Sequence, residues 1–118
     1  MARPPRTASA ISVQRGSVWW VALDPTRGSE IRKTRPAVVL SADGLNRARH
    51  AIVVVPLSTG PMPYPPIVVP TPSAGAGSVA VCDQVRAVDK TRLAHVDGAL
   101  SREDMRAVED GVRAVLQL

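Results

Sequence analysis

The chain has 118 residues, 45% of them hydrophobic and 21% charged, with one cysteine and a net charge of +5. This length predicts a single domain. The lone Cys82 cannot form an internal disulfide and indicates a reducing compartment such as the cytoplasm. No apolar run approaches the ~20 residues of a membrane-spanning helix. Large multidomain enzymes, disulfide scaffolds and membrane proteins are therefore excluded.

The positive charge is concentrated in the first half of the chain. Residues 1–50 carry nine basic and three acidic side chains, whereas residues 51–118 carry six and seven. An arginine-rich half favours a polyanionic partner, because guanidinium groups match phosphate oxygens in pairs. A GC-rich genome explains the use of Arg over Lys equally well, but it explains the asymmetry less well.

The first residues differ in composition from the rest. Residues 1–12 mix Pro, Arg, Ser and Ala without periodicity and lack the apolar core of a signal peptide, which predicts a disordered basic tail. The remaining residues, 13–118, are expected to form one domain.

Short β-branched segments bounded by Gly, Pro and polar residues dominate this domain, and they predict about six strands. They are residues 17–23, 36–41, 51–58, 66–70, 78–89 (one or two strands) and 92–99. In the first, Trp19 and Trp20 are adjacent and must point to opposite faces, so one is expected in the core. The segment 51–58 is continuously apolar, which indicates burial on both faces. The prolines that flank 66–70 favour an edge position.

A helix is predicted to close the chain. Ser101 is followed by Arg-Glu-Asp, which is typical of an N-cap with acidic residues in the first turn. Apolar residues then recur at helical spacing and predict an amphipathic helix over 102–116, while residues 42–50 can hold one helical turn. Short strands with one terminal helix predict a mainly β fold, either a small β-barrel or a strongly bent sheet closed by the helix.

The polar loop 24–35 and its flanks carry the side chains that are best suited to catalysis or binding. A loop of this length is typical of a functional loop. Arg35 stands at the start of the second strand, Glu30 lies across the loop, and Ser58 and Thr59 end the third strand, which is expected to pair beside the second. A guanidinium, a carboxylate and one or two hydroxyls can therefore converge at one rim. Composition alone leaves a solvated loop with ordinary salt bridges equally open.

Other chemistries have less support in the sequence. The two histidines, Cys82 and the scattered carboxylates lack the close spacing of a zinc or calcium site, so neither a metal nor a cofactor is predicted. His50 and His95 can in principle act as an acid–base pair, but lone histidines in such places are more often surface residues. Cys82 lies in the apolar strand segment VAVCD and is expected to be a core residue rather than a nucleophile. The Gly-rich run 74–77 lacks the Lys and Ser/Thr of a phosphate-binding loop.

The block GSVWWVALDPTRGSEIRKTRPAVVLS, followed by VVVPLST and VCDQVRAV, resembles the MazF/PemK family of toxin endoribonucleases. The similarity runs from about Gly16 to the C-terminal helix, and its most specific part is the order Asp-Pro, Gly-Ser-Glu and Arg-Pro-x-Val-Val. The resemblance implies an SH3-like β-barrel with a C-terminal helix, a homodimer, and a MazE-like antitoxin that occupies the RNA groove. It also implies metal-independent, sequence-selective cleavage of single-stranded RNA or mRNA, in which the 2′-hydroxyl attacks the adjacent phosphorus and leaves 2′,3′-cyclic phosphate and 5′-hydroxyl ends.

The resemblance assigns roles to individual residues. The family's catalytic Arg falls on Arg35, its Glu on Glu30 and its catalytic Thr on Ser58, with Thr59 as the substitute hydroxyl. Because a guanidinium rarely loses its proton, Arg35 is expected to stabilise the phosphorane charge first and to donate a proton second. Glu30 is a candidate base, or it holds Arg35 or pairs across the dimer. The residues expected to contact RNA are Thr26, Arg27, Gly28, Ser29, Arg32, Lys33, Tyr64, Gln84 and Arg86.

Base stacking needs an aromatic side chain, and the candidates are the two tryptophans and Tyr64. Tyr64 in the Pro-rich loop 59–66 is the most exposed choice, whereas Trp20, on which the family's Trp falls, is expected to be structural. Two alternatives share the fold: a gyrase-poisoning toxin of the CcdB type, which acts through its terminal helix, and a degenerate toxin that binds RNA or its antitoxin but cleaves poorly. The presence of Glu30, Arg35 and a hydroxyl at Ser58 favours the ribonuclease.

Overall fold

The computed structural model describes residues 12–23 and 33–118. The predicted tail, apart from its last residue, lies outside this range. Six of the predicted site residues also lie outside the described residues: Thr26, Arg27, Gly28, Ser29, Glu30 and Arg32.

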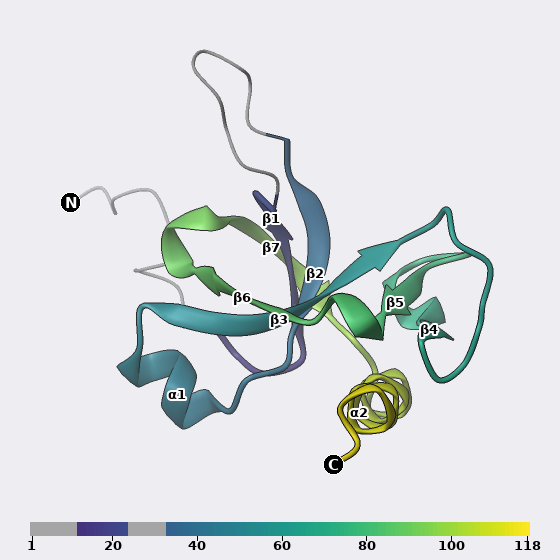
Figure 1. Ribbon diagram of the computed structural model, residues 1–118. Coiled ribbons are helices and arrows are strands. Elements are labelled where there is room, and N and C mark those ends of the chain that lie inside the picture. The colour runs from purple at the N-terminus through teal and green to yellow at the C-terminus, as the bar shows by residue number, and fades with distance from the viewer. Residues whose placement is uncertain (1–11, 24–32) are drawn as a thin grey trace.

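The described residues form seven strands, two α-helices and three short 3-10 helices (Figure 1). The elements are β1 (Ser17–Val21), β2 (Arg35–Val39), α1 (Asp43–Ala48), β3 (Ala51–Ser58), β4 (Val68–Pro70), η1 (Pro72–Ala74), β5 (Val79–Val81), η2 (Cys82–Gln84), β6 (Arg86–Asp89), η3 (Lys90–Arg92), β7 (Leu93–Ala99) and α2 (Arg102–Leu116). The predicted bounds of β3 and α2 are confirmed to the residue. The predicted segment 78–89 contains two strands, β5 and β6, separated by η2.

All strand pairs are antiparallel, in the order β4-β5-β3-β2-β1-β7, with β6 paired to β3. The long β3 joins the two halves of the sheet: Ala51–Val54 pair with β6, and Leu57 and Ser58 pair with β5. Figure 1 shows β3 crossing the molecule, with β6 along its first half and β5 at its tip. Among the described strands the pairing does not close, so the fold is a barrel-like, strongly bent sheet. As predicted, β4 lies at an edge.

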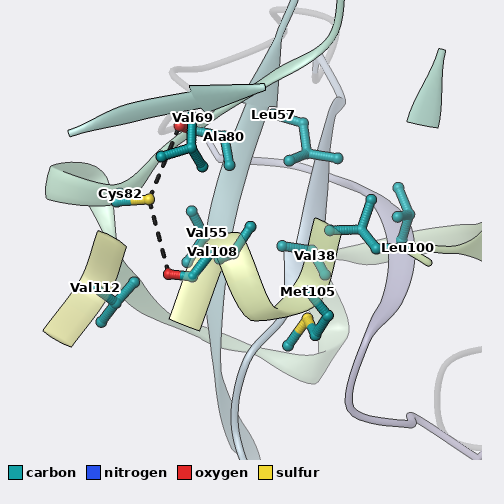
Figure 2. Packing of buried hydrophobic residues seen from close by; sticks show 11 residues of the cluster. Val38, Val55, Leu57, Val69, Ala80, Cys82, Leu100, Met105, Val108 and Val112 are labelled. Carbon is teal, nitrogen blue, oxygen red and sulfur yellow. Dashed lines mark hydrogen bonds between the residues drawn. The ribbon is translucent and has the colours of Figure 1, made fainter. Parts of the chain in front are cut away.

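Two apolar clusters fill the two sides of this sheet. One contains Trp19 and Val39 together with Ile52 and Val54. The other contains Val38 and buried residues of β3, β5 and α2 (Figure 2). Because successive strand residues face opposite sides, neighbouring valines of one strand enter different clusters. This explains why these strands are apolar without alternation.

Helix α2 packs closely over η2 and is fixed at its start. Ser101 is the predicted N-cap, and its Oγ accepts a hydrogen bond from the backbone N–H of Asp104 at 3.1 Å. A side chain at Gly111 would bring its Cβ to 2.6 Å from Cys82 Sγ and from the Pro66 carbonyl oxygen, so glycine permits the close approach. Cys82 is fully buried as predicted, but its predicted place in a strand is wrong, because it begins η2.

Candidate active site

The predicted site lies where β2 and β3 separate. The pairing of the two strands begins at Ala37 opposite Pro56, and beyond this point β3 pairs instead with β5 through Leu57 and Ser58. Extending the β2–β3 register by two residues sets Arg35 against Ser58. The two strands separate at this point, and two clefts lie beside Arg35 and Ser58.

The first cleft, which we call the Trp20 cleft, has a volume of about 460 Å³. It lies between β1, the start of β2, the end of β3, η1 and the end of β7. Its walls are Val18, Trp20, Arg35, Pro36, Leu57, Ser58, Thr59, Ser73, Ala74, Ser78, Asp97 and Ala99. Its polar groups are therefore mainly hydroxyls, with one guanidinium and one carboxylate.

The second cleft, which we call the Arg86 cleft, has a volume of about 430 Å³. Its walls are Leu23, Arg35, Pro56, Leu57, Ser58, Pro61, Val81, Gln84 and Arg86. The structure thus brings the predicted residues Gln84 and Arg86, from η2 and the start of β6, to the same rim as Arg35 and Ser58. Arg86 Nη1 donates a hydrogen bond to the Leu23 carbonyl at 3.1 Å, which ties β6 to the segment after β1.

The two candidate hydroxyls occupy different positions. Ser58 is half-buried and lines both clefts, whereas Thr59 is exposed and lines the Trp20 cleft. Ser58 Oγ accepts a hydrogen bond from the backbone N–H of Gly60 at 3.3 Å, so its hydroxyl hydrogen can be directed to a ligand. Arg35 is exposed at the first position of β2. A guanidinium beside a hydroxyl suits a phosphate group, because both present N–H or O–H donors.

Two predicted RNA contacts within the described residues lie outside the walls of both clefts. Lys33 is exposed two residues before β2. Tyr64 is 68% exposed, and its backbone pairs with Val68 at the base of the turn that leads into β4. The structure therefore brings Arg35, Ser58, Thr59, Gln84 and Arg86 together and leaves these two apart from them.

Sequence reasoning missed Asp97 and treated Trp20 as structural. Trp20 is half-buried and lies in the wall of the Trp20 cleft, and its Nε1 donates to Asp97 Oδ2 at 3.2 Å. The indole stacks on His95 with ring centroids 6.0 Å apart. The signal that could have found Asp97 is the Asp-Gly pair inside a strand pattern, which indicates a bulge.

Cys82 takes no part in this site. Cys82 is enclosed by β5 and α2 (Figure 2), where its Sγ lies 3.9 Å from the carbonyl oxygens of Ala80 and Val108. Burial, followed by the charge of Asp83, raises the pKa of the Cys82 thiol to about 11, so the thiol is protonated at neutral pH. Within residues 12–23 and 33–118, no three His, Cys, Asp or Glu side chains gather in a way that could hold a metal ion, and no helix is long and apolar enough to span a membrane.

Comparison with known proteins identifies relatives over most of the chain. A family model described as the PemK-like, MazF-like toxin of type II toxin-antitoxin systems matches residues 14–116. Endoribonuclease MazF9 of Mycobacterium tuberculosis is 31% identical over 90% of this chain and 98% of its own length. The endoribonuclease toxin MazF of Escherichia coli K12 is 33% identical over 86% and 91%.

Solved structures of low sequence identity share the fold. A MazE-MazF crystal structure from Deinococcus radiodurans superposes with a TM-score of 0.77 at 23% identity, covering 92% of this chain and 99% of the other. A mycobacterial endoribonuclease in complex with its cognate antitoxin superposes with a TM-score of 0.72 at 22% identity, covering 91% and 95%.

Proposed function

Because the chain belongs to the family of PemK-like and MazF-like toxins of type II toxin–antitoxin systems, we propose that it cleaves single-stranded RNA at short sequences without a metal ion. Its relatives are endoribonucleases, and this chain is an endoribonuclease of that family. The observation that carries the proposed chemistry is that Arg35 and Ser58 line both clefts. A phosphate at their shared wall would have one nucleotide on each side.

In the proposed reaction, the 2′-hydroxyl of the RNA attacks the adjacent phosphorus and the bond to the 5′-oxygen breaks. The protonated guanidinium of Arg35 has the stabilisation of the phosphorane charge as its first role, as fixed donors do for developing oxyanions. The hydroxyl of Ser58, with Thr59 as the alternative, donates to a phosphate oxygen. Glu30 is assigned the 2′ proton, and the leaving 5′-oxygen takes a proton from water, or from Arg35 in its second assigned role, and becomes a 5′-hydroxyl. The other product end is a 2′,3′-cyclic phosphate.

The remaining predicted residues are proposed to hold the RNA strand. Gln84 and Arg86 supply donors in the Arg86 cleft. Tyr64 offers an exposed ring on which a base can stack. The residues of the loop 24–35 that we propose as further RNA contacts are Thr26, Arg27, Gly28, Ser29, Arg32 and Lys33.

We further propose that the chain acts as a homodimer in the cytoplasm and is inhibited by a cognate antitoxin. This rests on family membership and on structural relatives that were solved together with MazE or with a cognate antitoxin. An extended antitoxin segment that lies across the two clefts would exclude RNA from Arg35 and Ser58.

The test is cleavage of a long mixed RNA by the full chain in EDTA, with Arg35→Ala prepared in parallel. We expect cuts at a recurring short sequence with 5′-hydroxyl ends for the wild type and no detectable cleavage for Arg35→Ala. The matched control is Arg106→Ala on the exposed face of α2, which removes the same charge and should cleave normally. If folded wild-type protein leaves the RNA intact, the proposal is wrong, and a DNA supercoiling assay would test the gyrase-poisoning alternative.

A further inference from the structure

The Trp20 cleft contains an acidic residue that the proposed reaction does not use. Asp97 lies in β7 at an irregularity of its pairing with β1. Trp19 pairs with Val96 and Ser17 pairs with Ala99, so three steps along β7 match two steps along β1. The extra residue is accommodated by Gly98, whose φ of 89° lies in the left-handed region that glycine adopts readily. Such a bulge re-aims a side chain, and here Asp97 lines the cleft.

The carboxylate of Asp97 is fixed in place but keeps room for a ligand. Its Oδ2 accepts one hydrogen bond from Trp20 Nε1, and the indole is supported by stacking on His95. A carboxylate offers about four lone-pair sites, so one neutral donor leaves both oxygens able to accept more. The group is thus a positioned acceptor at the wall of the cleft.

The part of the cleft wall formed by η1 is also held rigidly. Ser73 of η1 donates its backbone N–H to Asp104 Oδ2 at 2.7 Å, and its hydroxyl donates to the same oxygen. The backbone N–H of Ser101 donates to Ser73 Oγ at 3.0 Å. The start of α2 therefore fixes η1 against the cleft. A volume of about 460 Å³ falls within the range of small-ligand sites.

We propose that the Trp20 cleft is a guanine-selective nucleotide subsite in which Asp97 accepts hydrogen bonds from the base. The inference rests on the proposed RNA substrate, whose phosphate would lie at Arg35. Guanine presents two adjacent N–H donors, N1–H and N2–H, which match the two oxygens of one carboxylate. Adenine and cytosine place a ring-nitrogen acceptor beside their amino group, and uracil places its N3–H between two carbonyls. Each of these acceptors would face the negative charge of Asp97.

The charges of the cleft agree with this assignment. Arg35 and Asp97 are its two charged side chains among the described residues. The guanidinium of Arg35, on β2, attracts the phosphate. The carboxylate of Asp97 lies on β7, which is separated from β2 in the sheet by β1, and it is hydrogen-bonded to Trp20. A nucleotide would therefore be oriented with its phosphate towards β2 and its base towards β7.

Binding of mononucleotides tests the subsite without requiring cleavage. The full chain is titrated with 5′-GMP, AMP, CMP and UMP, and the indole N–H signals of the two tryptophans are followed by NMR. We expect the Trp20 signal to shift with GMP at a concentration at least about tenfold lower than with the other nucleotides. The Trp19 indole is buried and donates to Ser17 Oγ, so its signal should stay in place. Equal responses to all four nucleotides would overturn the inference.

The variant Asp97→Asn keeps the shape of the side chain and removes one acceptor and the charge. It should lose the GMP preference, whereas the control Asp110→Asn, an exposed carboxylate of α2 that pairs with Arg113, should keep it. In cleavage mapping, the wild type should require guanine at one fixed position and Asp97→Asn should relax that position. An unchanged preference in Asp97→Asn contradicts the inference even if RNA is cleaved. A GMP preference that depends on Asp97, found in a protein that cleaves no RNA, supports the inference and refutes the proposed function.

Discussion

The two clefts share one wall but differ in what they offer a ligand. Arg35, Leu57 and Ser58 belong to both. Beyond that wall, the Trp20 cleft presents the carboxylate of Asp97, whereas the Arg86 cleft presents the donors of Gln84 and Arg86. The difference between the two clefts would allow a small sheet to act on a phosphate at one place and to distinguish the nucleotides on its two sides, as we propose. Under the proposed function, the shared wall serves the chemistry and the separate walls serve recognition of the RNA.

The sharpest test of this division compares the two hydroxyls. Ser58 lines both clefts and Thr59 lines only one of them, so Ser58→Ala should lower kcat by about 10²–10³-fold, the usual cost of losing one donor to a developing oxyanion. Thr59→Ala should lower kcat less than about tenfold, because its loss leaves the shared wall intact. Single-turnover cleavage of a short mapped substrate measures both.

A restoring variant makes this comparison stricter. Ser58→Thr keeps the hydroxyl and should cleave within a few-fold of the wild type. Two mild alanine variants would show that the hydroxyl role is wrong. A severe Thr59→Ala with a mild Ser58→Ala would break the comparison itself, because the reacting phosphate would then lie in the Trp20 cleft rather than at the shared wall.

The Arg86 cleft should respond through binding rather than through the chemical step. Arg86→Ala should raise KM about tenfold with little change in kcat, and it should reduce the salt dependence of RNA binding by about 0.7 in log–log slope, the value for one phosphate contact on a single strand. The base preference of the Trp20 cleft should be unchanged.

Arg86 also donates to the Leu23 carbonyl, so its structural role needs a separate control. Arg86→Lys keeps the positive charge and should restore much of the affinity for RNA, even though lysine lacks the planar fork of N–H donors of the guanidinium. A thermal unfolding curve for each variant shows whether the fold is retained. If Arg86→Ala instead lowers kcat as strongly as Ser58→Ala, the separation of chemistry from recognition fails on this side.

Much of this arrangement was predictable because it depends on local pattern. The β-branched runs define the strands, and Ser101 with the helical apolar spacing defines α2. Arg35 beside Pro36 at the start of one strand, and Ser58 at the end of the next, were sufficient to predict a shared rim, because antiparallel neighbours bring such ends together.

The features that were missed depend on how distant segments pair. The sequence did not decide whether residues 78–89 form one strand or two, because η2, which divides them, contains no Gly or Pro. The bulge at Asp97 becomes visible only when β7 is paired with β1, because the extra residue of a bulge is defined by its partner strand. The predicted loop contacts Thr26 to Arg32 lie outside the described residues and stay predictions.

Substitution of Tyr64 tests whether RNA contacts extend beyond the two clefts, and it should have the smallest effect of these variants on RNA binding. Its ring is 68% exposed, and it belongs to the walls of neither cleft. If a base beyond the cleaved dinucleotide stacks on it, Tyr64→Ala should weaken binding of a longer RNA about fivefold, the lower end of base–aromatic stacking, and leave cleavage of a minimal substrate unchanged. Tyr64→Phe keeps the ring and should bind like the wild type. An equal loss on the minimal and the longer substrate would mean that the RNA path bends back to the clefts, whereas no loss on either would remove Tyr64 from the proposed RNA contacts.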